Sequence, residues 1–137
     1  MTSRTRASTG LRDTQILRDT DEPLGAALVA MIGDVYSSPP EFDQPASCLG
    51  RFRVLVATEP AVRAEYLRIS DAGEQLLADA IAERTGAGEK ELRPKVLAAI
   101  VIGAERAAIR HWINNRDVPL AETVDAAVRE ALDGVDR

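Results

Sequence analysis

Few residues in this chain are of types that do chemistry, and they are scattered along it. His111 is the single histidine and Cys48 the single cysteine, so no second His or Cys stands at the spacing that a zinc site requires. Glu83, Glu89 and Glu91 fall near a predicted helix end, where carboxylates are normally solvated. No GxSxG, GxGxxG or P-loop pattern occurs. These observations predict no catalytic site, no metal and no cofactor, and they favour a binding protein over an enzyme.

The single histidine has an ordinary structural explanation. His111 stands beside Trp112 late in an apolar segment. We therefore expect its ring to be packed, with one nitrogen hydrogen-bonded.

The charge of the chain disfavours a large nucleic-acid surface. The 137 residues carry a formal net charge of −5, whereas phosphate contacts need clustered Lys and Arg. Residues 1–20 alone lean basic, and we expect them to form a flexible tail before a folded domain at 21–137. One cysteine, no apolar leader and no apolar run of about 18 residues predict a cytoplasmic protein without membrane contact.

A binding site is predicted from the larger residues on apolar helix faces. Chains rich in Ala and Leu can leave a cavity between helices. Filling of the core by these residues is at least as compatible with the sequence. The candidates for the pocket are Met31, Tyr36, Phe52, Leu55, Tyr66 and Ile69.

The elements that would position these residues are helices. Apolar residues at helical spacing predict a helix over 22–36, which Asp21 can cap and Pro23 can begin. The prolines and serines of 37–45 predict a loop. Residues 48–57 fit a strand or a helix, and their position between helices favours a helix.

The second half of the chain predicts three more helices. Thr58 is a candidate N-cap for a long helix to about Thr85, which ends at the glycines of TGAG, 85–88. Glu59 and Arg63 are spaced to pair on this helix. Further helices are predicted over 90–115 and 119–133, and Asp125–Arg129 can pair on the last. The fold class is thus all-α, an antiparallel bundle of four to five helices.

The helix over 90–115 raises the question of what covers it. Residues 96–104 carry no polar side chain. One half of this helix, from Val96 through Ala107 to His111, is predicted to face the core. Ile102, Ile109 and Ile113 lie on the other side among charged residues. Either another helix of the same chain covers these isoleucines, or a second copy of the chain does.

Several segments together resemble a known family. They are DEPLGAALVAMI (21–32), FRVLVATEPAVRAEYL (52–67), the turn AERTGAG (82–88) and ELRPKVLAAIVIGAERAAIRHWI (91–113). Their order and spacing are similar to the C-terminal regulatory domain of tetracycline-repressor-type (TetR family) transcriptional regulators, over about residues 21–134. The individual motifs are loose, and none is a catalytic fingerprint.

The resemblance implies a homodimer that binds a small hydrophobic effector. In this family the last two long helices form the dimer interface and the other helices surround the ligand. The interface candidates that follow from it are Ile102, Ile109, Ile113, Val124 and Val128. The predicted function is therefore the effector-binding and dimerisation domain of a TetR-type regulator.

The chain departs from the family before residue 21. The family's DNA-reading half needs a helix-turn-helix, and residues 1–20 contain none of its pattern, so no DNA-contacting residue is predicted. A fragment of a full repressor, a degenerate gene and a stand-alone sensor all remain open. The alternative function is a helical interaction module without ligand, which dimerises with or sequesters another regulator.

Overall fold

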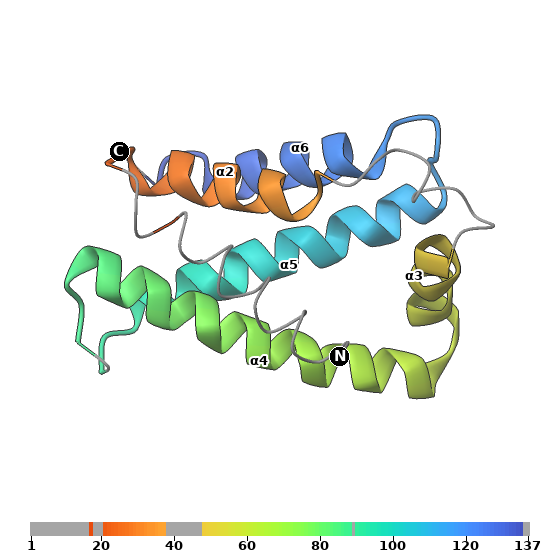
Figure 1. Ribbon diagram of the computed structural model, residues 1–137, viewed down its shortest axis with the longest axis horizontal. Helices are drawn as coiled ribbons and strands as arrows, with labels where there is room; N and C mark the ends of the chain where they lie inside the picture. The colour runs from red at the N-terminus through yellow and green to blue at the C-terminus, as the bar shows by residue number, and fades with distance from the viewer. Residues whose placement is uncertain (1–16, 18–20, 38–47, 89, 136–137) are drawn as a thin grey trace.

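The regular structure of the described part of the chain is helical. The computed structural model describes residues 17, 21–37, 48–88 and 90–135. Five helices follow one another: α2 (Leu24–Val35), α3 (Cys48–Thr58), α4 (Pro60–Thr85), α5 (Arg93–Ile113) and α6 (Leu120–Leu132) (Figure 1). The predicted all-α fold is confirmed, and the segment left open between strand and helix is helix α3.

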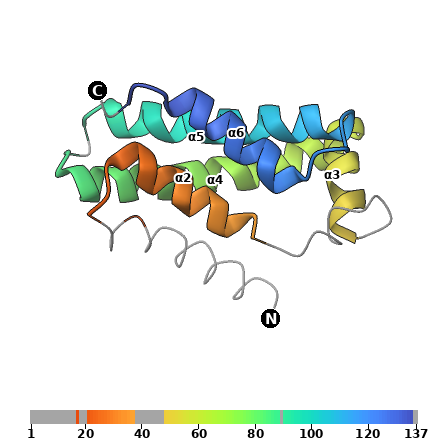
Figure 2. The same ribbon diagram turned by 90° about the horizontal axis from the view of Figure 1, so that it is seen from above.

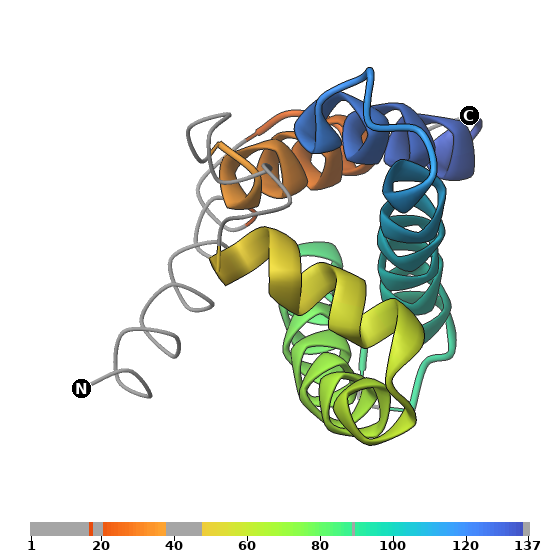
Figure 3. The ribbon, with the colours of Figure 1, turned by 90° about the vertical axis from the view of Figure 1, so that its right-hand side faces the viewer.

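The helices pack in layers around α5. Helix α5 runs between α4 on one side and the pair α2 and α6 on the other (Figures 1 and 2). Helix α6 folds back antiparallel along α5 after a short turn. Helix α3 does not join these layers but crosses the N-terminal end of α4 (Figure 3). This crossing places α3 across one end of the space between α4 and α5.

The core lies where α2, α4, α5 and α6 meet. Helix α6 contributes a fully regular apolar stripe, because its buried residues recur at every fourth position: Leu120, Val124, Val128 and Leu132. Trp112, in the last turn of α5, is fully buried. The Arg116 guanidinium lies 4.6 Å from the centroid of the Trp112 ring. A cation over an aromatic face is a favourable contact.

The isoleucine side of helix α5 is covered by its own chain, which is one of the two alternatives, but part of its predicted core face is exposed. Its isoleucine side faces α3 and α4 of the same chain, where Ile109 is buried and Ile113 half-buried. Val96, Ala107 and His111, predicted to face the core, are exposed. Helical spacing alone defines two sides of an apolar helix but not which one faces inward, and this assignment was wrong for those three residues.

The two ends of α4 are formed by Glu59 and Gly86. Thr58 is the last residue of α3, and its hydroxyl donates to the carbonyl of Val54 at 2.9 Å. It therefore does not cap α4, whose N-cap position is Glu59. At the other end of α4, Gly86 has φ +70 and closes the helix as predicted, since glycine adopts the left-handed conformation at little cost.

One residue of the expected N-terminal tail is part of the core. Leu17 is fully buried, and the Arg84 guanidinium donates to its carbonyl oxygen and to that of Glu22. Arg84 thereby holds the segment before α2 against the end of α4. The remainder of the predicted tail and nearly all of the loop 37–45 lie outside the described residues.

Among the residues that the structure describes, no helix is long and apolar enough to cross a membrane.

Candidate ligand cavity

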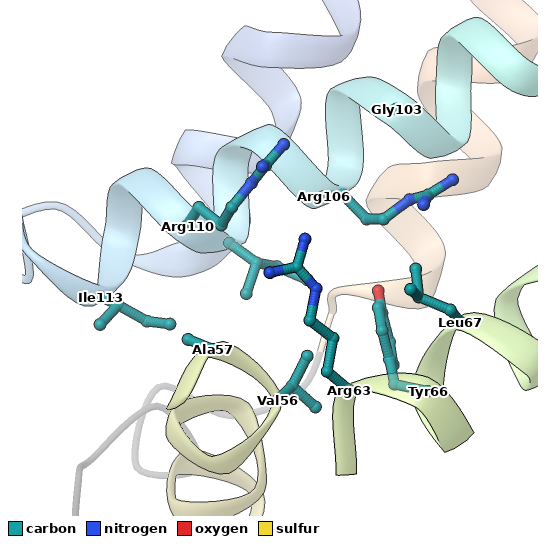
Figure 4. A pocket seen from close by; sticks show the side chains of 10 residues that line it. Val56, Ala57, Arg63, Tyr66, Leu67, Gly103, Arg106, Arg110 and Ile113 are labelled. Carbon is teal, nitrogen blue, oxygen red and sulfur yellow. The ribbon is translucent and has the colours of Figure 1, made fainter. Parts of the chain in front are cut away.

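A cavity opens between α3, α4 and α5. Its volume is about 340 Å³, within the range of small-molecule sites in proteins. Its walls are mostly apolar, with polar groups gathered on the facing sides of α4 and α5 (Figure 4). The lining residues are Val56, Ala57, Arg63, Tyr66, Leu67, Gly103, Arg106, Ile109, Arg110 and Ile113.

Helical spacing explains why these residues share one cavity. On α4, Arg63, Tyr66 and Leu67 stand at i, i+3 and i+4, which is one face of a helix. On α5 the lining residues repeat every three or four positions between Gly103 and Ile113. The last turn of α3 closes one end with Val56 and Ala57. Glu59 alone separates α3 from α4, so this wall is attached directly to the start of α4.

Three arginines make the cavity strongly basic. Arg63 comes from α4, and Arg106 and Arg110 come from α5. Figure 4 shows the Arg63 side chain and the Tyr66 ring rising from α4 toward α5. No Asp or Glu lines the cavity.

The guanidinium groups of these three arginines make no ion pair within the described part of the chain. The predicted pair of Glu59 with Arg63 is not formed. These two residues are joined only by the backbone hydrogen bond from the Arg63 N–H to the Glu59 carbonyl, at 2.9 Å. By contrast, the predicted Asp125–Arg129 pair on α6 is present at 2.8 Å.

Arg106 carries an unsatisfied donor. The side chain is half-buried, and its Nε is fully buried without a hydrogen-bond partner among the described residues. Buried polar groups in native proteins nearly always have a partner, either protein, water or ligand.

The structure places the six predicted pocket residues apart from one another. Only Tyr66 lines the cavity. Met31 is buried in the core, and Tyr36 is half-buried against it. Phe52, Leu55 and Ile69 are exposed outside the cavity. The predicted set and the lining of this cavity therefore share Tyr66 alone, because amphipathic spacing does not distinguish a core contact from a cavity wall or an outer surface.

The predicted interface residues also lie mainly inside the chain. Val124 and Val128 have 0% exposure, so they offer no surface to a second copy, and the prediction is corrected for them. Ile109 and Ile113 line the cavity, and Ile102 is half-buried. For Ile102, Ile109 and Ile113 a place in a dimer interface stays a prediction.

The arginines were missed because charged residues on a helix usually face solvent. A signal was present in the sequence, since Arg106, Ile109, Arg110 and Ile113 stand at i, i+3, i+4 and i+7. Charges interleaved with large apolar residues on one face are unusual for a solvated surface.

The structure also bears on the single histidine and on metal binding. His111 is exposed, so the prediction of a packed histidine is wrong. Within the described ranges no group of three His, Cys, Asp or Glu is placed to hold a metal ion.

Comparisons with known proteins agree with the fold. A family model of TetR-type regulators, described as the MftR C-terminal domain, matches residues 17–136. The chain is 31% identical over 115 residues to the HTH-type transcriptional regulator TcmR of Streptomyces glaucescens, covering 83% of this chain and 50% of that protein. It is 28% identical over 87 residues to the mycofactocin biosynthesis transcriptional regulator MftR of Mycobacterium tuberculosis (strain ATCC 25618 / H37Rv), covering 64% and 43%. The chain thus spans about half the length of these relatives.

Proposed function

Because this chain belongs to the TetR family of transcriptional regulators, matching its MftR-type C-terminal domain, we propose that it is the effector-binding and dimerisation part of such a regulator. The effector would occupy the cavity between α3, α4 and α5. Its binding would change the affinity of the complete regulator for DNA. This coupling requires that the effector bind one conformation of the regulator better than another.

The cavity is the observation that carries the proposal. A volume of about 340 Å³ falls within the range of small-molecule sites, which are mostly apolar clefts with a few polar groups. It lies between the helix that carries most of the intramolecular packing, α5, and the helix pair α3 and α4. A ligand there would touch all three helices at once and could shift them relative to one another.

A second copy of the chain fits the outer face of α5. Val96, Ile100 and Ala107 stand at i, i+4 and i+11 on this face, where they are exposed or half-buried. Ala127 on the neighbouring α6 is half-buried and extends the same small, apolar surface. Small residues let two helices approach closely, and a two-fold pair would bury this surface symmetrically. We name these four residues the outer stripe.

The dimer is tested by introducing a charge into the outer stripe. Ala107→Glu should give a particle of one chain by light scattering at tens of micromolar, while the unchanged chain gives two. Ala126→Glu is the matched control, because Ala126 is an exposed alanine of α6 outside the stripe. If Ala107→Glu left the dimer intact, this face would be removed from the interface.

Effector binding is tested separately by thermal unfolding. A ligand present at about 100 times its Kd stabilises the native state by about 2.7 kcal/mol. Ala57→Trp should fill the end of the cavity and remove this stabilisation, since Ala57 lines it. Native mass spectrometry of the protein purified from its own host would identify a retained ligand. A ligand that binds the Ala57→Trp variant equally well would place the site elsewhere.

A further inference from the structure

The cavity is incompletely covered by the chain that contains it. Among its lining residues only Ile109 is buried, while Ala57, Arg63, Gly103 and Arg110 are exposed. Small-molecule sites normally cover roughly 70–90% of the surface of their ligand. A ligand bound to the single chain would instead remain in contact with solvent. One chain therefore leaves part of the wall of this site unbuilt.

The exposed part of the wall on α5 borders the outer stripe. Gly103 lines the cavity, and it stands three residues after Ile100 and four residues before Ala107. Residues at these spacings are neighbours on the surface of a helix. Ile100 and Ala107 belong to the outer stripe, so a second copy seated on the stripe would lie directly against this edge of the cavity.

We propose that the second copy of the chain completes the cavity by covering its edge at Gly103 and Arg110. This inference rests on the proposed dimer and the proposed effector site, and it adds that the site is incomplete in one chain. The covering element is helix α6 of the second copy, laid against α5 of the first.

The charges of the last two helices are complementary for this pairing. The second half of α5 places Arg106 and Arg110 at the cavity, whose lining contains no acidic residue. Helix α6 carries three carboxylates, of which one pairs within the helix. The other two, Glu122 and Glu130, are exposed. Opposite charges across an interface favour association and fix its register, so a second α6 over this edge brings carboxylates toward the guanidinium groups.

The shared wall has a consequence for regulation. A molecule that both copies enclose interacts more strongly with the dimer than with the single chain. By thermodynamic linkage it must then tighten the dimer by the same factor by which dimerisation tightens its own binding. Occupancy of the cavity and assembly of the regulator are thereby coupled without a change inside either chain.

Thiol labelling measures whether the second copy covers the cavity. The full chain carries Cys48→Ser, which removes the single native thiol, together with either Leu67→Cys or Leu76→Cys. Leu67 is half-buried in the cavity wall, whereas Leu76 is exposed on the same helix outside the lining. Mass spectrometry follows the reaction with N-ethylmaleimide over a dilution series, and light scattering gives the particle mass in the same samples.

The expected result is protection of the cavity thiol in the dimer alone. Leu67→Cys should react at least about tenfold more slowly in the dimer than in the Ala107→Glu monomer, because a covered group reacts only when its cover opens. Leu76→Cys should react at the same rate in both. Val56→Cys, on the α3 wall, repeats the measurement at a second cavity position.

A substitution at the cavity edge tests the same contact from the side of the dimer. A Cβ atom at Gly103 would meet no other part of the described chain within 4 Å, so Gly103→Leu should leave the far-UV circular dichroism unchanged. It should raise the Kd of the dimer about tenfold or more, since an added side chain overpacks a close contact. Gly73→Leu is the matched control, because Gly73 is an exposed helical glycine with equal space and lies outside the cavity lining.

The outcomes separate this inference from the proposed function. A dimer whose Leu67→Cys and Val56→Cys thiols react as fast as in the monomer would overturn the shared wall and leave the proposed dimer standing. A dimer that Gly103→Leu weakens no more than Gly73→Leu would overturn it as well. A particle of one chain at every concentration of the unchanged protein would refute the proposed dimer and this inference together, while Ala57→Trp tests the effector site independently.

Discussion

Two adjacent leucines of α4 should differ greatly in what they contribute to stability. Leu76 and Leu77 both follow the apolar spacing of the helix. In the structure Leu77 is 3% exposed and Leu76 is 48% exposed. Replacing each with alanine makes the same chemical change at neighbouring positions of one helix, so helix propensity cancels in the comparison. The difference between the two variants therefore measures burial alone.

The magnitude follows from the atoms removed. Leu→Ala deletes three carbons, worth about 2.4 kcal/mol when fully buried at about 0.8 kcal/mol each. At Leu77 a residual cavity raises the loss to about 3–4 kcal/mol. At Leu76 about half of the side chain already touches water, and no closed cavity forms, so the loss is about 1 kcal/mol or less. The expected difference is at least about 2–3 kcal/mol.

The assay uses the one tryptophan of the chain. Trp112 is 1% exposed, so its emission should shift to longer wavelength on unfolding in urea, with far-UV circular dichroism as a second probe. Both variants are measured at the same protein concentration, because the stability of a dimer depends on concentration. Losses for the two variants that agree within about 0.5 kcal/mol, or a larger loss for Leu76→Ala, would refute the assignment of the inner face of α4.

Three further outcomes are expected from single positions. Arg84→Met should lower the free energy of unfolding by about 1.5–3 kcal/mol, because it removes hydrogen bonds from a charged group to the carbonyls of Leu17 and Glu22. The loss is measured by urea unfolding, and a value below about 0.5 kcal/mol would contradict the role of Arg84 in holding this segment. Gly86→Ala should cost about 1–2 kcal/mol, since Gly86 has φ +70 and an alanine there is strained; an unchanged denaturation midpoint would contradict it. The neighbouring Arg68 lowers the pKa of Glu65, first by a hydrogen bond and then by its charge, so their exposed pair contributes above that pKa and weakens as the pH falls through it. NMR titration of the Glu65 carboxyl should accordingly show a pKa that rises toward its ordinary value in Arg68→Gln, and an unchanged pKa would exclude the pair in solution.

Local patterns predicted the helices well because their determinants are local. Periodic apolar residues, Pro60 at the start of α4 and Gly86 at its end act over a few residues, and the observed bounds differ little from those expected. The Asp125–Arg129 pair lies within one helix, and its spacing alone brings the two groups together. Family membership was also evident from the order of such segments.

The site itself required the tertiary structure. Tyr66 lines a cavity and Met31 fills the core because of how α3 crosses α4 and how far α4 lies from α5. The spacing of apolar residues predicts neither of these features. Three residues of α5, Val96, Ala107 and His111, were assigned to the wrong side of the helix for the same reason. Both sides of this helix are apolar, so its rotation is decided by whichever neighbours pack against it.

The sequence by itself thus determined an all-α chain of the TetR type, with its helix ends and an apolar penultimate helix. Only the tertiary structure decided that Arg63, from one helix, faces the same cavity as Arg106 and Arg110 from another. Arg63 is separated from Arg106 and Arg110 by more than forty positions. Helix propensity and capping act through the adjacent backbone, whereas a binding site depends on how whole helices pack, which no single segment encodes.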